Sequence, residues 1–141
     1  MLLNLTYNDK LIYKKVDETV GKPFTIKERL ALSGVTSPKF AIAESSIEIH
    51  NLLILDRHPD SCQIEMRPEG IIVRFRSLLE TYGLIIPYYK LSVFKGQKNI
   101  YSIYRDQYFI KIKSTERNEI DFIKKLTQYK AEKYTSGPNG F

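Results

Sequence analysis

The feature that most constrains this chain is a succession of short apolar segments between residues 47 and 114, separated by turn sequences. In 70–77, for example, Ile71, Val73 and Phe75 alternate with other residues at the period of two that a half-buried strand shows. Connections this short join antiparallel neighbours only. The sequence therefore predicts a meander of about seven strands, at 47–55, 63–67, 70–77, 82–86, 90–95, 100–104 and 108–113.

One amphipathic helix is predicted over 115–133. Ile120, Ile123 and Leu126 recur at helical spacing, and Phe122 widens the apolar stripe. Acidic residues cluster in the first turns and lysines in the last turns, as the helix dipole favours. We expect the stripe to pack into the sheet. The fold class is then α+β: a strongly bent antiparallel sheet or barrel closed by a C-terminal helix.

The first 46 residues have a less regular pattern. A turn sequence predicts a weak hairpin between 2–6 and 11–16. Thr25 and Glu28 fit a capping box, and Gly34 is placed to end the short helix that follows. Apolar residues are too frequent here for a mobile tail. We therefore expect this extension to pack on the core or to cover an edge of the sheet.

Composition places the chain among folded proteins of one domain: 141 residues, of which 43% are hydrophobic and 27% charged. We divide it into an N-terminal extension (1–46), a principal domain (47–133) and a flexible tail (134–141). A single cysteine excludes an intramolecular disulfide. Neither a signal peptide nor a run of membrane-spanning length is visible, so we expect a cytoplasmic protein by default.

The formal net charge of +6 invites an anionic partner. Counted over 1–46, 47–114 and 115–141, however, the charge is +2, +3 and +1. A surplus this dispersed is typical of a soluble surface and favours no nucleic-acid footprint.

Three runs carry a family resemblance: Glu-Gly-Ile-Ile-Val at 69–73, Ile-Pro-Tyr-Tyr-Lys-Leu-Ser-Val at 86–93 and Phe-Ile-Lys-Lys-Leu at 122–126. With them, the chain resembles the bacterial pleckstrin-homology-like (PH-like) domains over 47–133. The resemblance implies a barrel that the C-terminal helix closes. It also implies a binding platform for lipid headgroups, peptides or other proteins rather than an enzyme.

The residue types that catalysis or metal binding needs do not form a known pattern. His50, Asp56, His58, Asp60 and Cys62 lie close in sequence but match no ligand spacing, so they predict a polar loop with a half-buried thiol. Neither histidine stands in a nucleophile signature with the cysteine. A glycine-rich phosphate loop is also missing. The sequence thus predicts no enzyme, no metal and no cofactor.

Two clusters are candidates for binding. Arg67, Arg74 and Arg76 lie across one predicted hairpin, where guanidinium groups hold phosphate oxygens well. The alternative is a solvated sheet face on which they pair with Glu65 or Glu80. The second cluster is a candidate stacking platform for bases, or simply a set of half-buried strand positions: Tyr82, Tyr88, Tyr89, Tyr101, Tyr104 and Tyr108.

These observations favour a non-enzymatic binding or interaction module. The partner expected first is a protein or peptide at an exposed strand edge, with an anionic membrane surface as the alternative. A small nucleic-acid-binding barrel that uses tyrosine faces with Lys111 and Lys113 is the second hypothesis.

Overall fold

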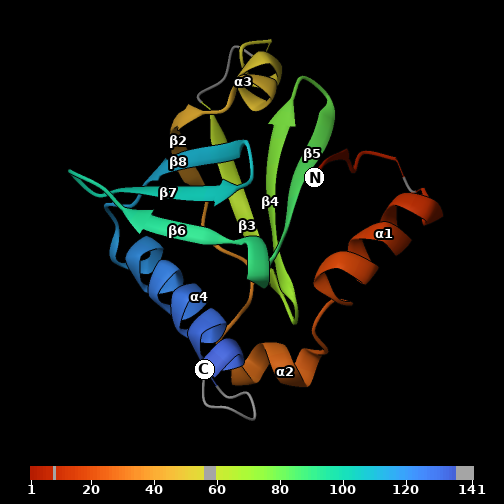
Figure 1. The fold of residues 1–141 in the computed structure, drawn as a ribbon, viewed down its shortest axis with the longest axis vertical. Helices are drawn as coiled ribbons and strands as arrows, with labels where there is room; N and C mark the ends of the chain where they lie inside the picture. Colours follow the sequence, from red (N-terminus) through yellow and green to blue (C-terminus); the bar gives the residue numbers. More distant parts are fainter. Residues whose placement is uncertain (8, 56–59, 136–141) are drawn as a thin grey trace.

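A computed structural model describes residues 1–7, 9–55 and 60–135, and Figure 1 shows its ribbon. The fold is α+β, an eight-stranded antiparallel sheet with a C-terminal helix. Its elements are β1 (Leu2–Asn4), α1 (Lys10–Val20), α2 (Ile26–Ala31), β2 (Phe40–Ser45), α3 (Ile47–Leu53), β3 (Ser61–Arg67), β4 (Gly70–Ser77), β5 (Glu80–Pro87), η1 (Tyr88–Lys90), β6 (Ser92–Lys95), β7 (Ile100–Arg105), β8 (Tyr108–Lys113) and α4 (Arg117–Thr135). Within the described ranges, no helix has the length and apolar character that a membrane span requires. Most of the predicted tail, 136–141, lies outside those ranges.

The sheet has the strand order β1-β5-β4-β3-β2-β8-β7-β6. We call β3, β4 and β5 the β3–β5 half and β6, β7 and β8 the β6–β8 half; in Figure 1 the strands of one half run across those of the other. Strand β2 joins them, because Phe40 pairs with Cys62 of β3 and Ala41 pairs with Lys113 of β8. A register shift after Ile42 bends this strand. Over the described residues, the sheet does not close into the expected barrel, and its edges are β1 and β6.

The main core lies between the inner faces of the two halves and α4. The alternation predicted for β4 is confirmed, because Ile71, Val73 and Phe75 are all buried in this core. The predicted packing of the C-terminal helix is confirmed for Phe122, Ile123 and Leu126, which are buried in the same cluster, whereas Ile120 is only half-buried and is not part of it. The helix therefore covers the inner side of the sheet.

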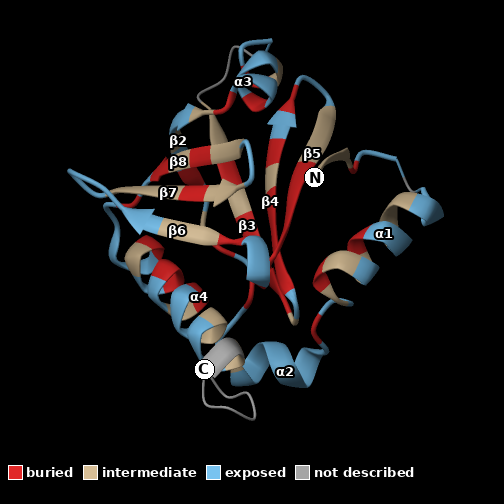
Figure 2. Cartoon of the chain, in the orientation of Figure 1, coloured by how far each residue is buried: buried red, intermediate tan, exposed pale blue. Residues whose placement is uncertain are grey.

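A second, smaller core lies on the outer face of the β3–β5 half. Ile72 and Ile85 are buried there against Val16 and Val20 of α1, and Figure 2 shows β4 buried along most of its length. Strand β1 pairs with β5 and so covers that edge of the sheet. Residues before β2 thus shield one face and one edge of this half.

The prediction of a hairpin between 2–6 and 11–16 is wrong. Only 2–4 are extended, as β1, and 11–16 belong to helix α1. Asp9 caps this helix, since its side chain accepts a hydrogen bond of 2.9 Å from the Leu11 amide. The apolar residues that pack are four apart, as on one face of a helix, rather than two apart.

Helix α2 is the short helix that the capping box predicted. The Thr25 hydroxyl accepts from the Glu28 amide at 3.2 Å, and the Glu28 carboxylate accepts from the Thr25 amide at 3.0 Å. Gly34, at a φ of 92°, follows the helix. The helix itself buries no residue, however, and it is the flanking Phe24 and Val35 that pack on the core.

Residues 47–55 form helix α3 and a turn, not the predicted strand. Ile49 and Leu53, four residues apart, are buried beneath the helix, whereas Ile47 and Ile54 are exposed. Their β-branched composition predicted a strand, but burial of one helical face outweighs that weak propensity.

The sheet differs from the predicted meander in two ways: it contains a strand that was not predicted, and two consecutive strands are not neighbours. The joining strand β2, which the sequence analysis missed, is short and contains two alanines, so its alternation is weak. Strands β5 and β6 are consecutive but are not neighbours, because η1 turns the chain away after Pro87. Six of the expected strands, all except 47–55, do form.

Candidate functional site

The arginine cluster lies on the outer face of the β3–β5 half, beside α1. The Arg67 side chain is only 4% exposed. It donates hydrogen bonds to the Asp17 carboxylate at 3.1 Å, to the Gly21 carbonyl at 2.8 Å and to the Glu65 carboxylate. Arg74 donates to the other oxygen of Glu65. This network fastens α1 to the sheet.

The carboxyl group of Glu65 stands between two arginines, and its side chain is 16% exposed. Burial by itself raises the pKa of such a group. The hydrogen bond from Arg67 and the charge of Arg74 outweigh that effect and hold the pKa of Glu65 below its ordinary value. Glu65 is therefore ionised at neutral pH and offsets part of the arginine charge.

The three arginines do not form one open anion site. Arg74 and Arg76 do point away from the core, as predicted, and Arg76 is exposed, with its Nε donating to the Leu78 carbonyl at 2.8 Å. Arg67, by contrast, is buried among its partners, and the pairing with Glu65 was the alternative reading of this cluster. Anion binding by the remaining arginines stays a prediction.

The thiol of Cys62 is buried, not half-buried as expected: the residue is only 2% exposed, because it points from β3 into the main core. Burial raises its pKa to about 12, so the thiol is protonated at neutral pH and is not poised as a nucleophile. Within the described residues, no group of three ligand-type side chains is placed to hold a metal ion. Asp56 and His58, two of the residues considered as ligands, lie outside those residues.

The six tyrosines do not share a face. Tyr82, Tyr101 and Tyr108 pack against the core, and Tyr88 is buried in it. Tyr89 is exposed. The sixth, Tyr104, belongs to a different aromatic row on the outer face of the sheet.

That outer row lies on the β6–β8 half and joins the rings of Phe94, Tyr104 and Phe109. Their centroids are 5.8 Å and 5.7 Å apart. The Lys111 ammonium lies 5.8 Å from the Phe109 ring centroid and 2.9 Å from the Glu44 carboxylate. Two of the three rings are phenylalanines, which a search among tyrosines misses; the alternation along 108–113 is the signal that places Phe109 beside Lys111.

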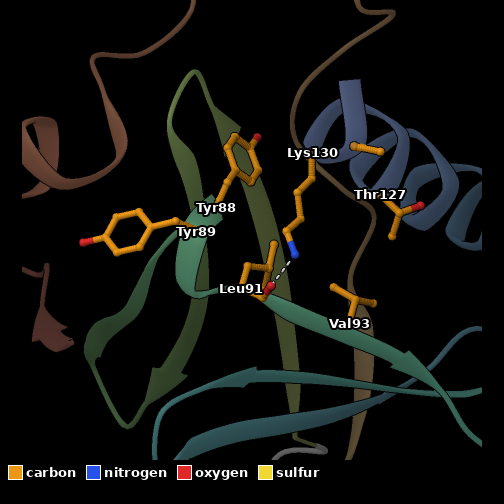
Figure 3. Close-up of a pocket in the computed structure, with 7 residues that line it drawn as sticks. Tyr88, Tyr89, Leu91, Val93, Thr127 and Lys130 are labelled. Atoms are coloured by element: carbon orange, nitrogen blue, oxygen red, sulfur yellow. Dashed lines mark hydrogen bonds between the residues drawn. The ribbon is translucent and has the colours of Figure 1, made fainter. Parts of the chain in front are cut away.

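A pocket of about 560 Å³ lies between β6 and α4 (Figure 3). Leu91 and Val93 contribute from the sheet, and Thr127 and Lys130 contribute from the helix. In Figure 3 the Lys130 side chain extends across the pocket, and its ammonium donates a hydrogen bond to the Leu91 carbonyl. The lining residues are Tyr88, Tyr89, Leu91, Val93, Thr127, Lys130 and Ala131. Most of this lining is apolar, as in sites that bind side chains.

Beside this pocket, β6 presents a free backbone edge. The Gly96 amide donates to the Ile100 carbonyl at 2.6 Å, which sets the hydrogen-bonding phase of the β6–β7 hairpin. Since hydrogen-bonded pairs alternate, Phe94 also bonds to β7, and the N–H and C=O groups of Val93 and Lys95 point away from the sheet. No strand in the described part of the chain pairs with that side.

Positive charge is concentrated in the segment that forms the β6–β8 half. Residues 88–114 carry six Lys/Arg and one acidic residue, a net charge of +5, whereas 47–87 carry four and six, a net charge of −2. The value of +3 for 47–114 conceals this difference. The positive charge of 88–114 becomes visible only when the count is divided at the end of β5, at residue 87.

Comparison with models of protein families gives no match to this chain. Curated proteins and solved structures likewise give no match.

Proposed function

We propose that this chain is a non-enzymatic, PH-like binding module that takes up an extended peptide as an added strand along β6. The antiparallel sheet of β2–β8, followed by a C-terminal helix α4 that packs on its inner face, agrees with the helix-covered sheet that the resemblance implies, and this order supports the proposal. Strand β1 and helix α1 are additions to that plan.

The observation that carries the proposal is the free edge of β6 directly beside an apolar pocket. Outward N–H and C=O groups can bind the backbone of a peptide whatever its sequence, and a neighbouring pocket selects among the side chains of that peptide. On the opposite edge, β1 already occupies the position that an added strand would take.

The charge of β6 makes a foreign strand a better partner than a second copy. Lys90 lies two residues before the strand and Lys95 is its last residue, and lysines on an edge strand oppose pairing between copies of the same chain. A peptide without that positive charge meets no such repulsion.

The test is selection from a displayed library of random linear peptides, followed by binding to pocket variants. Ala131 lines the pocket and is exposed, so Ala131→Trp fills the pocket without changing the core. Selected peptides should bind Ala131→Trp at least about tenfold more weakly than the wild type, a loss of roughly 1.4 kcal/mol.

The matched control is Gln128→Trp, an exposed position on the same helix that does not line the pocket. This variant should bind the peptides as the wild type does. Selection of no peptide above background, or equal binding by both tryptophan variants, would remove the proposal.

The second candidate function is binding of single-stranded nucleic acid on the outer face of the β6–β8 half. The specific observation is the row of Phe94, Tyr104 and Phe109 beside Lys111, on the half that carries the positive charge. Rings of this kind stack with bases, and lysines attract the phosphates. Weaker binding of labelled oligothymidine by Phe94→Ala, with a steep salt dependence, would support this function.

An anionic membrane surface is the other partner that the resemblance implies. We place it after the peptide because Arg67 and Arg74 are engaged by carboxylates of the protein. Sedimentation with vesicles that contain anionic lipid measures it directly; binding there, with none to peptides, would reverse the order of the two proposals.

A further inference from the structure

Lys130 is the charged residue of the pocket between β6 and α4. Its side chain is half-buried, and its ammonium donates to the neutral carbonyl of Leu91. An ammonium has three N–H donors, so two remain for a ligand. Because Leu91 directly precedes β6, the Lys130 ammonium lies at the end of the pocket nearest the start of that strand.

The protein supplies no counter-charge to this ammonium among its described residues. One turn further along α4, Lys133 pairs with Glu69 at 2.7 Å, and Lys90 pairs with Asp106 at 3.7 Å, whereas Lys130 forms no ion pair. A half-buried cation with a neutral acceptor gains from a carboxylate, because charge-assisted hydrogen bonds are about twice as strong as neutral ones.

The direction of β6 fixes where that carboxylate stands in a bound peptide. In an antiparallel strand, the peptide residue opposite Val93 has its side chain on the pocket side, as Val93 does. The residue opposite Leu91 comes two positions later in the peptide and lies beside Lys130.

We propose, resting on the function proposed above, that the groove recognises an apolar residue followed two positions later by a carboxylate. Val93 and Ala131 enclose the apolar side chain, and Lys130 binds the carboxylate. The carboxylate belongs either to an acidic side chain or to the free C-terminus of the peptide. The +5 charge of residues 88–114 attracts the same acidic partner over a longer range.

The experiment measures fluorescence polarisation of labelled peptides at low salt. The first pair is amidated Ser-Thr-Phe-Thr-Glu-Thr and its Gln counterpart, and a third peptide has the Glu two positions before the Phe. The second pair is Ser-Thr-Phe-Thr-Val with a free or an amidated end, which distinguishes a terminal carboxylate from a side-chain carboxylate.

The wild type should bind the Glu peptide about tenfold more tightly than the Gln and reversed peptides. Lys130→Gln should abolish this preference, and Lys130→Arg should keep it. Lys124→Gln removes the same charge from an exposed position of the same helix and should leave the preference intact.

Equal binding of the Glu and Gln peptides to the wild type would overturn the carboxylate requirement but leave the peptide-binding function standing. A preference that persists in Lys130→Gln would overturn the role of Lys130. A preference for the reversed peptide would overturn the antiparallel direction. If the wild type bound none of these peptides and selected none from the library, the proposed function and this inference would both fall.

Discussion

In the β3–β5 half, both faces and the outer edge are covered: α4 and the main core lie on one face, α1 lies on the other, and β1 pairs with β5. In the β6–β8 half, the described chain covers the inner face only, and the edge of β6 is free. Both halves are three-stranded and antiparallel. The β3–β5 half is covered on its outer face and edge because α1 and β1, which lie more than forty residues earlier in the sequence, pack on it.

Charge follows the same division. Arg67 and Arg74, on the outer face of the covered half, pair with carboxylates of the protein, whereas the open half carries an excess of lysine beside the exposed Phe94. An alternating strand pattern therefore says which residues share a face but not whether that face meets solvent, another element or a ligand. Variants that change the cover of one half test this comparison directly.

The largest effect is expected from deletion of residues 1–20, which makes the covered half resemble the open one. Loss of β1 and α1 exposes Ile72, Ile85 and the edge of β5. An exposed apolar face next to a free edge promotes association, so the shortened chain should self-associate. Light scattering after gel filtration measures this. A stable monomer with an unchanged urea midpoint would show that the cover is dispensable.

Truncation of outward-facing side chains gives the next largest difference between the halves. Ile72→Ala, beneath α1, should lower the free energy of unfolding by about 2–5 kcal/mol, since it leaves a cavity in a packed site. Phe94→Ala, at a residue that is 59% exposed, should change that energy by less than about 0.5 kcal/mol. Urea unfolding of both variants checks the pair. Equal losses would mean that the two outer faces are equally covered.

Removal of a buried guanidinium tests the network that fastens α1. Arg67→Met leaves Asp17 and Glu65 without their shared partner and should lower the free energy of unfolding by about 3 kcal/mol. Arg76→Met, at an exposed position of the same half, should stay within about 0.5 kcal/mol of the wild type. If the two variants had the same free energy of unfolding in urea, the hydrogen bonds of Arg67 to Asp17 and Glu65 would contribute nothing to stability.

Acid should weaken the covered half through Glu65. Its pKa is lower in the folded protein than its ordinary value of 4.5, so its contribution to stability is fully present above that pH. The contribution is lost as the pH falls through the lower, folded value. Urea midpoints of the wild type and Glu65→Gln, measured downward from pH 6, should converge in acid. Parallel curves would argue that Glu65 gains nothing from its arginines.

Local periodicity was sufficient to predict the strands at 70–77 and the C-terminal helix, because Ile71, Val73 and Phe75 repeat at two and Ile123 and Leu126 repeat at helical spacing. The pattern failed at 47–55, where a β-branched composition fits a strand but the residues that become buried, Ile49 and Leu53, are four apart. Short segments of this kind satisfy both periods.

The candidate site was less accessible to sequence analysis. The alternation of strand residues correctly placed Arg74 on the outer face. Arg67, however, pairs with Asp17, which lies fifty positions earlier on a helix that the sequence pattern predicted as part of a hairpin. The pocket unites 88–93 with 127–131, and no local pattern brings these segments together. An exposed edge was expected, yet only the strand order shows that β6 provides it.

The joining strand β2 has a consequence for the order in which this protein acquires its structure. Each half consists of hairpins between consecutive strands, which form quickly because few residues separate the partners. Strand β2 gains β8 as a neighbour only after residues 108–113 have been synthesised, more than sixty positions later in the chain. Pulsed hydrogen exchange during refolding should therefore protect β3–β5 amides before those of β2, and simultaneous protection would contradict this sequence of events. During synthesis, the side of β2 that faces β8 and the inner face of the sheet stay uncovered until β8 and α4 leave the ribosome, and during that interval the chain exposes a free strand edge and an apolar face.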